Sequence, residues 1–151
     1  MTSLVSSPGA LLLVGPALML VLAAVPAAVA SRDPQRMGRL VQAAALAGLA
    51  FTLVAALWEA LGGADTPATL VVLGSDTGPI PLALSVLADS LTFTILGLVA
   101  LLAALIARYS TNYLAGEAAQ GEFFRSLALT SGAFMLVVIA GNMLMFVLAI
   151  F

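Results

Sequence analysis

The sequence predicts an all-α membrane protein with four to five transmembrane helices and a short β-like external arm between the second and third of them. Of its 151 residues, 63% are hydrophobic and 8% are charged, whereas soluble domains carry about 25% charged residues. Small soluble domains bury only about two-thirds of their surface. A chain this short therefore cannot hide this much apolar surface in a core. Long apolar runs recur along the chain, and all five basic residues are arginines placed between or at the ends of these runs.

The absence of two residue types excludes several kinds of chemistry. The chain has no cysteine and no histidine, which removes thiol nucleophiles, zinc sites of the usual kind and catalytic triads built on histidine. The net charge of −2 gives no reason to expect a nucleic-acid partner. We therefore expect no cofactor in this chain, and any acid–base chemistry in it would have to use carboxylates, arginine, tyrosine or water.

The first apolar run, residues 9–30, is long enough to span a membrane. At about 1.5 Å per residue it covers the roughly 30 Å hydrocarbon core. Pro16 and Pro26 can kink the helix. A cleaved signal peptide is the alternative, because Ala28-Val29-Ala30 resembles a cleavage site; no basic residue precedes the run, and a second run follows at once.

The second predicted helix covers residues 40–62, after a linker, residues 31–39, that holds Arg32, Arg36 and Arg39. Trp58 near its end suits a membrane surface, where tryptophan is enriched. The segment 63–87 is rich in Gly, Pro, Asp and Thr. It contains Thr-Leu-Val-Val-Leu (69–73) before a turn-forming Gly-Ser-Asp-Thr-Gly-Pro (74–79), and it therefore predicts the β-like arm.

The third predicted helix covers residues 89–109, and a polar link, 110–125, separates it from the apolar run 126–151. That last run can be one long tilted helix. We favour a break at Gly141-Asn142, which divides it into helices at 126–141 and from 142 to 151 onward, because asparagine is a good helix N-cap. The last helix would then cross only half a membrane, so we expect residues 1–151 to form the N-terminal transmembrane domain of a longer protein.

The arginines predict an orientation. If the spans alternate, the linker 31–39, Arg108 and Arg125 all lie on one side of the membrane, and the positive-inside rule makes that side cytoplasmic. The N-terminus and the arm, residues 63–87, then face outside. The expected location is a bacterial inner membrane, with lipid as the surrounding partner.

Two carboxylates are candidate ion-path residues, since ionisable groups near a membrane are functional candidates by default. Asp89 opens the third helix, where it is either an N-cap alone or a structural or proton-linked carboxylate. Glu59 lies in the last turn of the second helix, a poor place for a negative charge on dipole grounds. The alternative for Glu59 is a side chain that has reached solvent.

Two further candidates lie at helix ends. Arg108 closes the third helix, where it is either a membrane-surface anchor or a cation beside an ion path. Asn142 is the residue that would orient the helix after the break. The remaining charged residues of the polar link, Glu117, Glu122 and Arg125, are expected to form a solvated face, and Ala43–Ala45, Ala47 and Gly48 to permit close helix packing.

Four short motifs keep one order along the chain. They are Leu-Ala-Asp-Ser-Leu-Thr (87–92), Ala-Arg-Tyr-Ser-Thr-Asn-Tyr-Leu-Ala-Gly-Glu (107–117), Gln-Gly-Glu-Phe-Phe (120–124) and Val-Val-Ile-Ala-Gly-Asn-Met-Leu (137–144). Together they resemble the N-terminal part of the large proton-translocating subunits of respiratory complex I and of Mrp-type cation/proton antiporters. The family commonly carries a histidine in the third helix, which is absent here, and a Gly-Trp-Glu after the break, where this chain has Phe151 at the position of the Glu.

The Arg-Tyr-Ser form, the Gly-Glu-x-x-Gln-Gly sequence and the missing Gly-Trp-Glu look most like the membrane subunit of DAB-type inorganic carbon accumulating complexes. That resemblance implies an ion-translocating subunit, driven by protons or Na⁺, that energises CO2 or bicarbonate accumulation. It also implies a zinc-containing partner similar to carbonic anhydrases, so we expect this chain to be a transporter subunit rather than an enzyme, with any catalysis in the partner subunit. The alternatives are a proton-pumping subunit of complex I or an Mrp-type antiporter and, from another class, a structural membrane scaffold.

Overall fold

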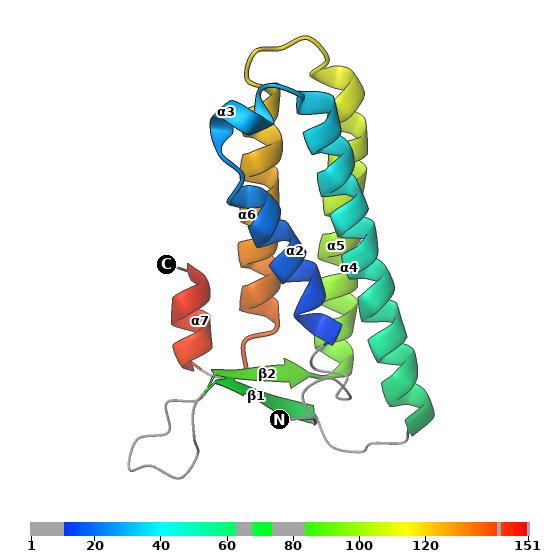
Figure 1. Ribbon diagram of the computed structural model, residues 1–151. Helices are drawn as coiled ribbons and strands as arrows, with labels where there is room; N and C mark the ends of the chain where they lie inside the picture. The colour runs from blue at the N-terminus through cyan, green and yellow to red at the C-terminus, as the bar shows by residue number, and fades with distance from the viewer. Residues whose placement is uncertain (1–10, 63–67, 74–83, 142, 151) are drawn as a thin grey trace.

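The computed structural model describes residues 11–62, 68–73, 84–141 and 143–150 (Figure 1). It consists of helices and two short strands, and the strands lie between the helices α4 and α5 in the chain. In chain order, the elements are α2 (Val14–Ala23), α3 (Ala27–Ala30), α4 (Pro34–Gly62), β1 (Ala68–Leu73), β2 (Leu84–Ala88), α5 (Ser90–Tyr113), α6 (Gln120–Val138) and α7 (Met143–Ile150).

Three of the described helices, α4, α5 and α6, are long and apolar enough to cross a membrane, with mean hydropathies of 2.1, 2.4 and 1.3 over their most apolar windows. At most 39% of any of these windows is buried inside the chain. The rest is an outward-facing apolar surface, which only lipid or other membrane-embedded protein can cover. The predicted class, an all-α membrane protein, is confirmed.

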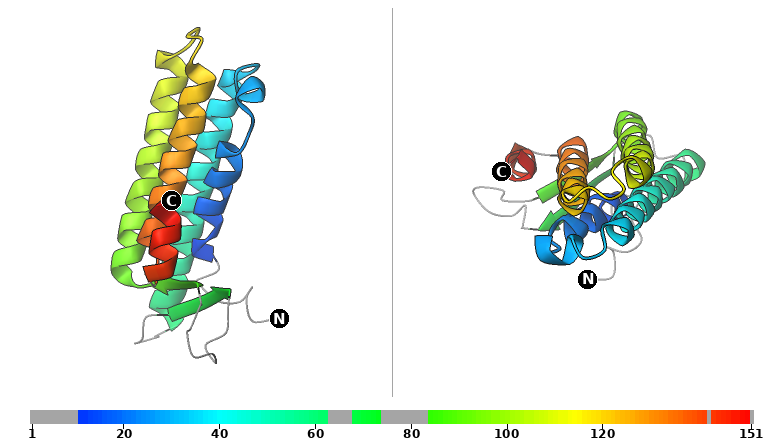
Figure 2. Two further views of the ribbon diagram at one scale, coloured as in Figure 1. Left: turned by 90° about the vertical axis from the view of Figure 1, so that its left-hand side faces the viewer. Right: turned by 90° about the horizontal axis from the view of Figure 1, so that it is seen from above.

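The three long helices lie side by side, and α2 packs against α4 and α6 (Figures 1 and 2). The start of α4, the end of α5 and the start of α6 meet at one end, which we call the arginine end because it holds all five arginines. The end of α4, the start of α5 and the two strands meet at the other, the hairpin end (Figure 1). The structure thus confirms that alternating helices gather the arginines at one end.

The first apolar run forms two helices instead of one. Pro26, with φ −57° and ψ 139°, adopts an extended conformation between α2 and α3, and a proline lacks the N–H that would continue the helix. The break leaves α2 as a short apolar helix of ten residues in the described part of the chain.

The linker and the polar link are both shorter than the sequence predicts. α4 begins at Pro34, so Arg36 and Arg39 lie inside it, because proline is favoured in the first turn of a helix. α5 runs on to Tyr113 and α6 begins at Gln120. The polar residues there did not end the helices because helix ends at a membrane surface can be solvated. A turn at Gly116, with a φ of 92°, joins the two helices.

Small residues allow α2 and α4 to approach closely, as predicted. A Cβ atom placed on Gly48 would lie 3.1 Å from the Cα of Gly15, and both glycines are buried. Ala44 and Ala45 of the predicted small-residue stretch are buried as well. The seam of α5 is also built of small side chains, because Ala100, Ala103, Ala104 and Ala107 are all at most 4% exposed.

The arm between the second and third spans is a two-stranded antiparallel sheet. β1 pairs with β2 from Ala68 opposite Ala88 to Leu73 opposite Leu84, with an irregularity near Val71. The predicted strand 69–73 is therefore confirmed, and the predicted turn, residues 74–79, lies outside the described residues.

The last apolar run is broken, as favoured from the sequence. α6 ends at Val138, and α7 then lies beside α6 and turns back along it (Figures 1 and 2). Ala140, between the two helices, forms an antiparallel bridge with Val86 of β2. The hairpin therefore holds the point where the chain reverses. Asn142 lies outside the described residues.

Candidate functional site

The structure brings two of the four predicted site residues to the same end. Glu59, near the end of α4, and Asp89, directly before α5, both lie at the hairpin end. Arg108 lies toward the arginine end of α5, and Asn142 is outside the described residues. The hairpin end is therefore the place where the candidate carboxylates gather.

Asp89 is the N-cap of α5. Its backbone is extended (φ −137°, ψ 170°), and its Oδ1 accepts a hydrogen bond of 2.6 Å from the backbone N–H of Thr92. Hydrogen bonding from Thr92, through its side chain and then its backbone N–H, lowers the pKa of the Asp89 carboxyl from its ordinary value of 3.8. Asp89 is thus an ionised cap that satisfies a free N–H at the positive end of the helix.

We expect Asp89→Ala to destabilise the protein by about 1 kcal/mol, because it removes the cap. Asp89→Asn should cost much less near neutral pH, since asparagine caps equally well. The carboxylate's own contribution is present above its ordinary pKa of 3.8 and is lost as the pH falls through the lowered pKa. Denaturant unfolding of the three proteins in detergent at neutral and acidic pH measures this. Equal stabilities of the alanine and wild-type proteins would refute the capping role.

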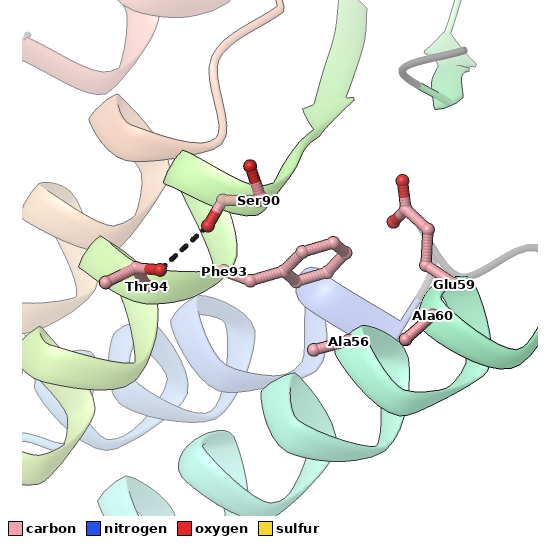
Figure 3. Close-up of a pocket in the computed structure, with 6 residues that line it drawn as sticks. All are labelled: Ala56, Glu59, Ala60, Ser90, Phe93 and Thr94. Carbon is pink, nitrogen blue, oxygen red and sulfur yellow. Dashed lines mark hydrogen bonds between the residues drawn. The ribbon is translucent and has the colours of Figure 1, made fainter. Parts of the chain in front are cut away.

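Glu59 borders a cavity of about 390 Å³ between the end of α4 and the start of α5, which we call the Glu59 cavity. Ala56, Glu59 and Ala60 contribute one wall (Figure 3). The other wall is the first turn of α5, from which the buried ring of Phe93 projects toward the α4 wall, with Ser90 and Thr94 beside each other behind it (Figure 3). The Thr94 hydroxyl donates a 2.8 Å hydrogen bond to the Ser90 carbonyl.

The Glu59 side chain is neither fully exposed nor satisfied. The residue is half-buried, and its Oε2 is buried and has no hydrogen-bond partner among the described residues. A buried carboxylate oxygen without a partner is costly unless water or an ion contacts it. Glu59 is therefore a half-buried residue that lines a cavity, and both interpretations of it, an ion-path carboxylate and a side chain that has reached solvent, stay predictions.

Sequence reasoning missed the residues of α5 that complete this cavity. Ser90, Phe93 and Thr94 carry no motif that marks them as cavity residues, and they face Glu59 only because α4 and α5 run antiparallel. The available signal was their position. They occupy the first turn of a helix that starts at the level where the preceding helix ends.

Arg108 lies on the exposed face of α5, while Ala103, Ala104, Ala107 and Ser110 form its buried face. Beside it, the exposed rings of Tyr109 and Tyr113 stack with centroids 5.6 Å apart. An arginine next to exposed tyrosines at a helix end is typical of a membrane-surface anchor. Within the described residues, Arg108 contacts no cavity at the hairpin end.

Arg125 has a structural partner that the predicted solvated face does not explain. Its Nε donates a 2.9 Å hydrogen bond to the carbonyl of Ala23, the last residue of α2. The Pro26 break removes the regular helical partner of this carbonyl, and the guanidinium takes its place. Glu117, Glu122 and Arg125 are all exposed, as predicted.

Comparisons with known proteins agree with the motifs. Residues 75–124, which include α5 and the first turn of α6, match the family model described as the NADH-Ubiquinone oxidoreductase (complex I), chain 5 N-terminus. The chain is also 44% identical over 90 residues, 60% of its length, to a protein of Halothiobacillus neapolitanus described as a "Probable inorganic carbon transporter subunit DabB2". The resemblance inferred from the motifs is confirmed.

The matched part covers 15% of that relative's own length. The match to the family model covers β2, α5 and the first turn of α6, and it does not include the end of α4, where Glu59 lies.

Proposed function

We propose, from this similarity, that the chain is part of an ion-translocating membrane subunit that passes protons or Na⁺ and thereby energises inorganic carbon accumulation. The observation that carries the proposal is that the chain matches both the complex I chain 5 N-terminus and a probable inorganic carbon transporter subunit. Both descriptions concern membrane subunits, and three described helices are able to cross a membrane.

The charge distribution supports an ion-conducting role. The carboxylates Glu59 and Asp89 lie at the hairpin end, whereas the arginines lie at the opposite end. Carboxylates near a membrane attract cations, and ionisable side chains in such places mark ion paths. Under the positive-inside rule the arginine end faces the cytoplasm of a bacterial inner membrane, so the hairpin end faces outside, which agrees with the orientation expected from the sequence.

The partner in this proposal is a zinc-containing subunit similar to carbonic anhydrases. The sequence has no cysteine and no histidine, and zinc sites that activate water are built mainly from these residues. Hydration of CO2 would therefore take place in the partner, and this chain would supply the ion flow that drives it.

The second candidate is a proton-pumping subunit of complex I or an Mrp-type antiporter, which the description of the matched family model favours. A structural membrane scaffold is the candidate from another class. Ion dependence separates the scaffold from both transporters, and inorganic carbon uptake separates the two transporters.

Uptake of labelled inorganic carbon by cells that carry the complete complex tests the proposal. We expect uptake to require the subunit and to stop when a protonophore or a Na⁺ ionophore collapses the coupling gradient. The ionophore that stops uptake identifies the ion. Uptake that persists under both ionophores would exclude gradient-driven transport, and normal uptake without the subunit would favour another function.

A further inference from the structure

We propose that the Glu59 cavity is a water-filled vestibule that gathers small hydrated monovalent cations at the hairpin end of the protein. The inference deepens the proposed function and rests on it for the destination of the cation, but the existence of the vestibule can be tested without transport. Glu59 supplies the negative charge, and the first turn of α5 supplies the hydroxyl-bearing opposite wall (Figure 3).

The size and lining of the Glu59 cavity indicate that it holds water. Its volume of about 390 Å³ is far above the space that one water molecule needs. Empty cavities in proteins are lined by apolar groups alone, whereas this one is bordered by a carboxylate and by Ser90 and Thr94. The Thr94 side chain is exposed, so the cavity is open on that side.

One oxygen of the Glu59 carboxylate lacks a protein partner. The Oε2 of Glu59 is buried, and no described side chain or backbone group donates a hydrogen bond to it. A hydrated cavity satisfies this oxygen through water, which makes nearly as favourable a hydrogen bond as a protein donor. Water in the cavity thus accounts for a carboxylate that the surrounding protein leaves without a donor.

The charges around the cavity favour cations over anions. None of the five arginines of the chain lies at the hairpin end, where the charged groups of the described residues are Glu59 and Asp89. Asp89 already accepts the N–H of Thr92 as a helix cap. A concave site with low-dielectric walls and one unneutralised carboxylate concentrates cations and repels anions. Glu59 is therefore the group that holds the cation.

The sequence offers a clean way to test this, because it contains no cysteine. Single cysteines are introduced into the complete membrane-bound protein at Ala56→Cys and Thr94→Cys, which lie in the cavity wall. Leu57→Cys is the matched control, since Leu57 is adjacent in sequence and 61% exposed on the outer face of α4. Each variant is treated with membrane-impermeant cationic and anionic methanethiosulfonate reagents.

We expect both cavity cysteines to react from the hairpin side and the lipid-facing cysteine to remain unreacted. Ala118→Cys, in the exposed turn at the arginine end, should react from the opposite side and shows that the reagents are active. Failure of both cavity cysteines to react, while this control reacts, would overturn the vestibule. Equal reaction of Leu57→Cys would overturn it as well.

The role of Glu59 is tested by adding Glu59→Gln to each cavity cysteine. The cationic-to-anionic ratio of reaction rates should fall by about tenfold, the low end of the effect of a focused field. An unchanged ratio would show that Glu59 does not attract cations there. A vestibule that passes both tests in a complex without ion transport would contradict the proposed function alone, whereas transport through a protein with no reactive cavity would contradict the vestibule alone.

Discussion

Gly121→Ala is expected to destabilise the protein by about 1–3 kcal/mol, the cost of inserting an extra methyl group into a closely packed contact. A Cβ atom on Gly121 would lie 2.6 Å from the carbonyl oxygen of Ala30 and 2.9 Å from the backbone nitrogen of Ser31. These are backbone atoms, which cannot move aside as the end of a flexible side chain can. α6 would have to move away from the end of α3.

Denaturant unfolding of the protein in detergent measures this cost, and Gly97→Ala is the matched control. Gly97 lies inside α5, and a Cβ there would meet only Leu49 Cδ1 at an ordinary 3.7 Å. Alanine is favoured over glycine in a helix interior by roughly 0.5–1 kcal/mol, so the control should be neutral or stabilising. A Gly121→Ala protein as stable as Gly97→Ala would contradict the close approach of α6 and α3.

Arg125→Ala is expected to cost about 1.5–3 kcal/mol, the usual worth of a hydrogen bond made by a charged group. The substitution leaves the Ala23 carbonyl at the end of α2 without its donor. Arg36→Ala is the matched control at the same end. The ion pair between Arg36 and Asp33 is exposed (side chains 80% and 52% exposed), and such pairs contribute roughly 0–1 kcal/mol.

Amide hydrogen exchange distinguishes the local loss of the hydrogen bond from Arg125 to Ala23 from a general loss of stability. In the Arg125→Ala protein, exchange should rise first in the amides of α3 and the Pro26 break, because α6 no longer holds the end of α2. A uniform increase in exchange rates over α4 and α5, with amides at the Pro26 break exchanging no faster than the others, would show that Arg125 does not stabilise this region locally.

The sequence predicted the parts of the fold that depend on composition. The apolar runs located the long helices, the arginines located one end of the bundle, and the Gly-Pro-rich segment located the first strand, but not β2 or its pairing with β1. Helix boundaries were less predictable. Pro34 begins α4 well inside the expected linker, and polar residues extend α5 to Tyr113, because helices at a membrane surface end where caps and solvent permit.

The candidate site was predictable only in part. Asp89 follows from a local rule, since an acidic residue directly before an apolar helix is a cap. The Glu59 cavity depends on how the end of α4 packs against the start of α5, and the contact from Arg125 to Ala23 joins residues 102 positions apart. No local pattern contains this information.

The structure also gives a packing explanation for the Gln-Gly-Glu-Phe-Phe motif that suggested the family. The buried Gln120 donates a 3.4 Å hydrogen bond from Nε2 to the Thr111 carbonyl. Gly121 allows the approach to α3, and the fully buried Phe124 fills the space beside Gly38, where a Cβ would lie 2.7 Å from its ring. The motif therefore joins α3, α4, α5 and α6 at the arginine end.

In the proposed function this chain forms part of an ion path, and with the proposed vestibule that path begins at Glu59. Ion flux through proteoliposomes that contain the complete complex tests it most directly, with Glu59→Gln compared with Glu117→Gln, whose carboxylate is exposed at the arginine end. We predict that ion flux falls about tenfold or more in Glu59→Gln, because the carboxylate no longer concentrates cations in the vestibule. Ion flux should be unchanged in Glu117→Gln. Normal ion flux through a fully assembled Glu59→Gln complex would show that the ion path does not begin at Glu59.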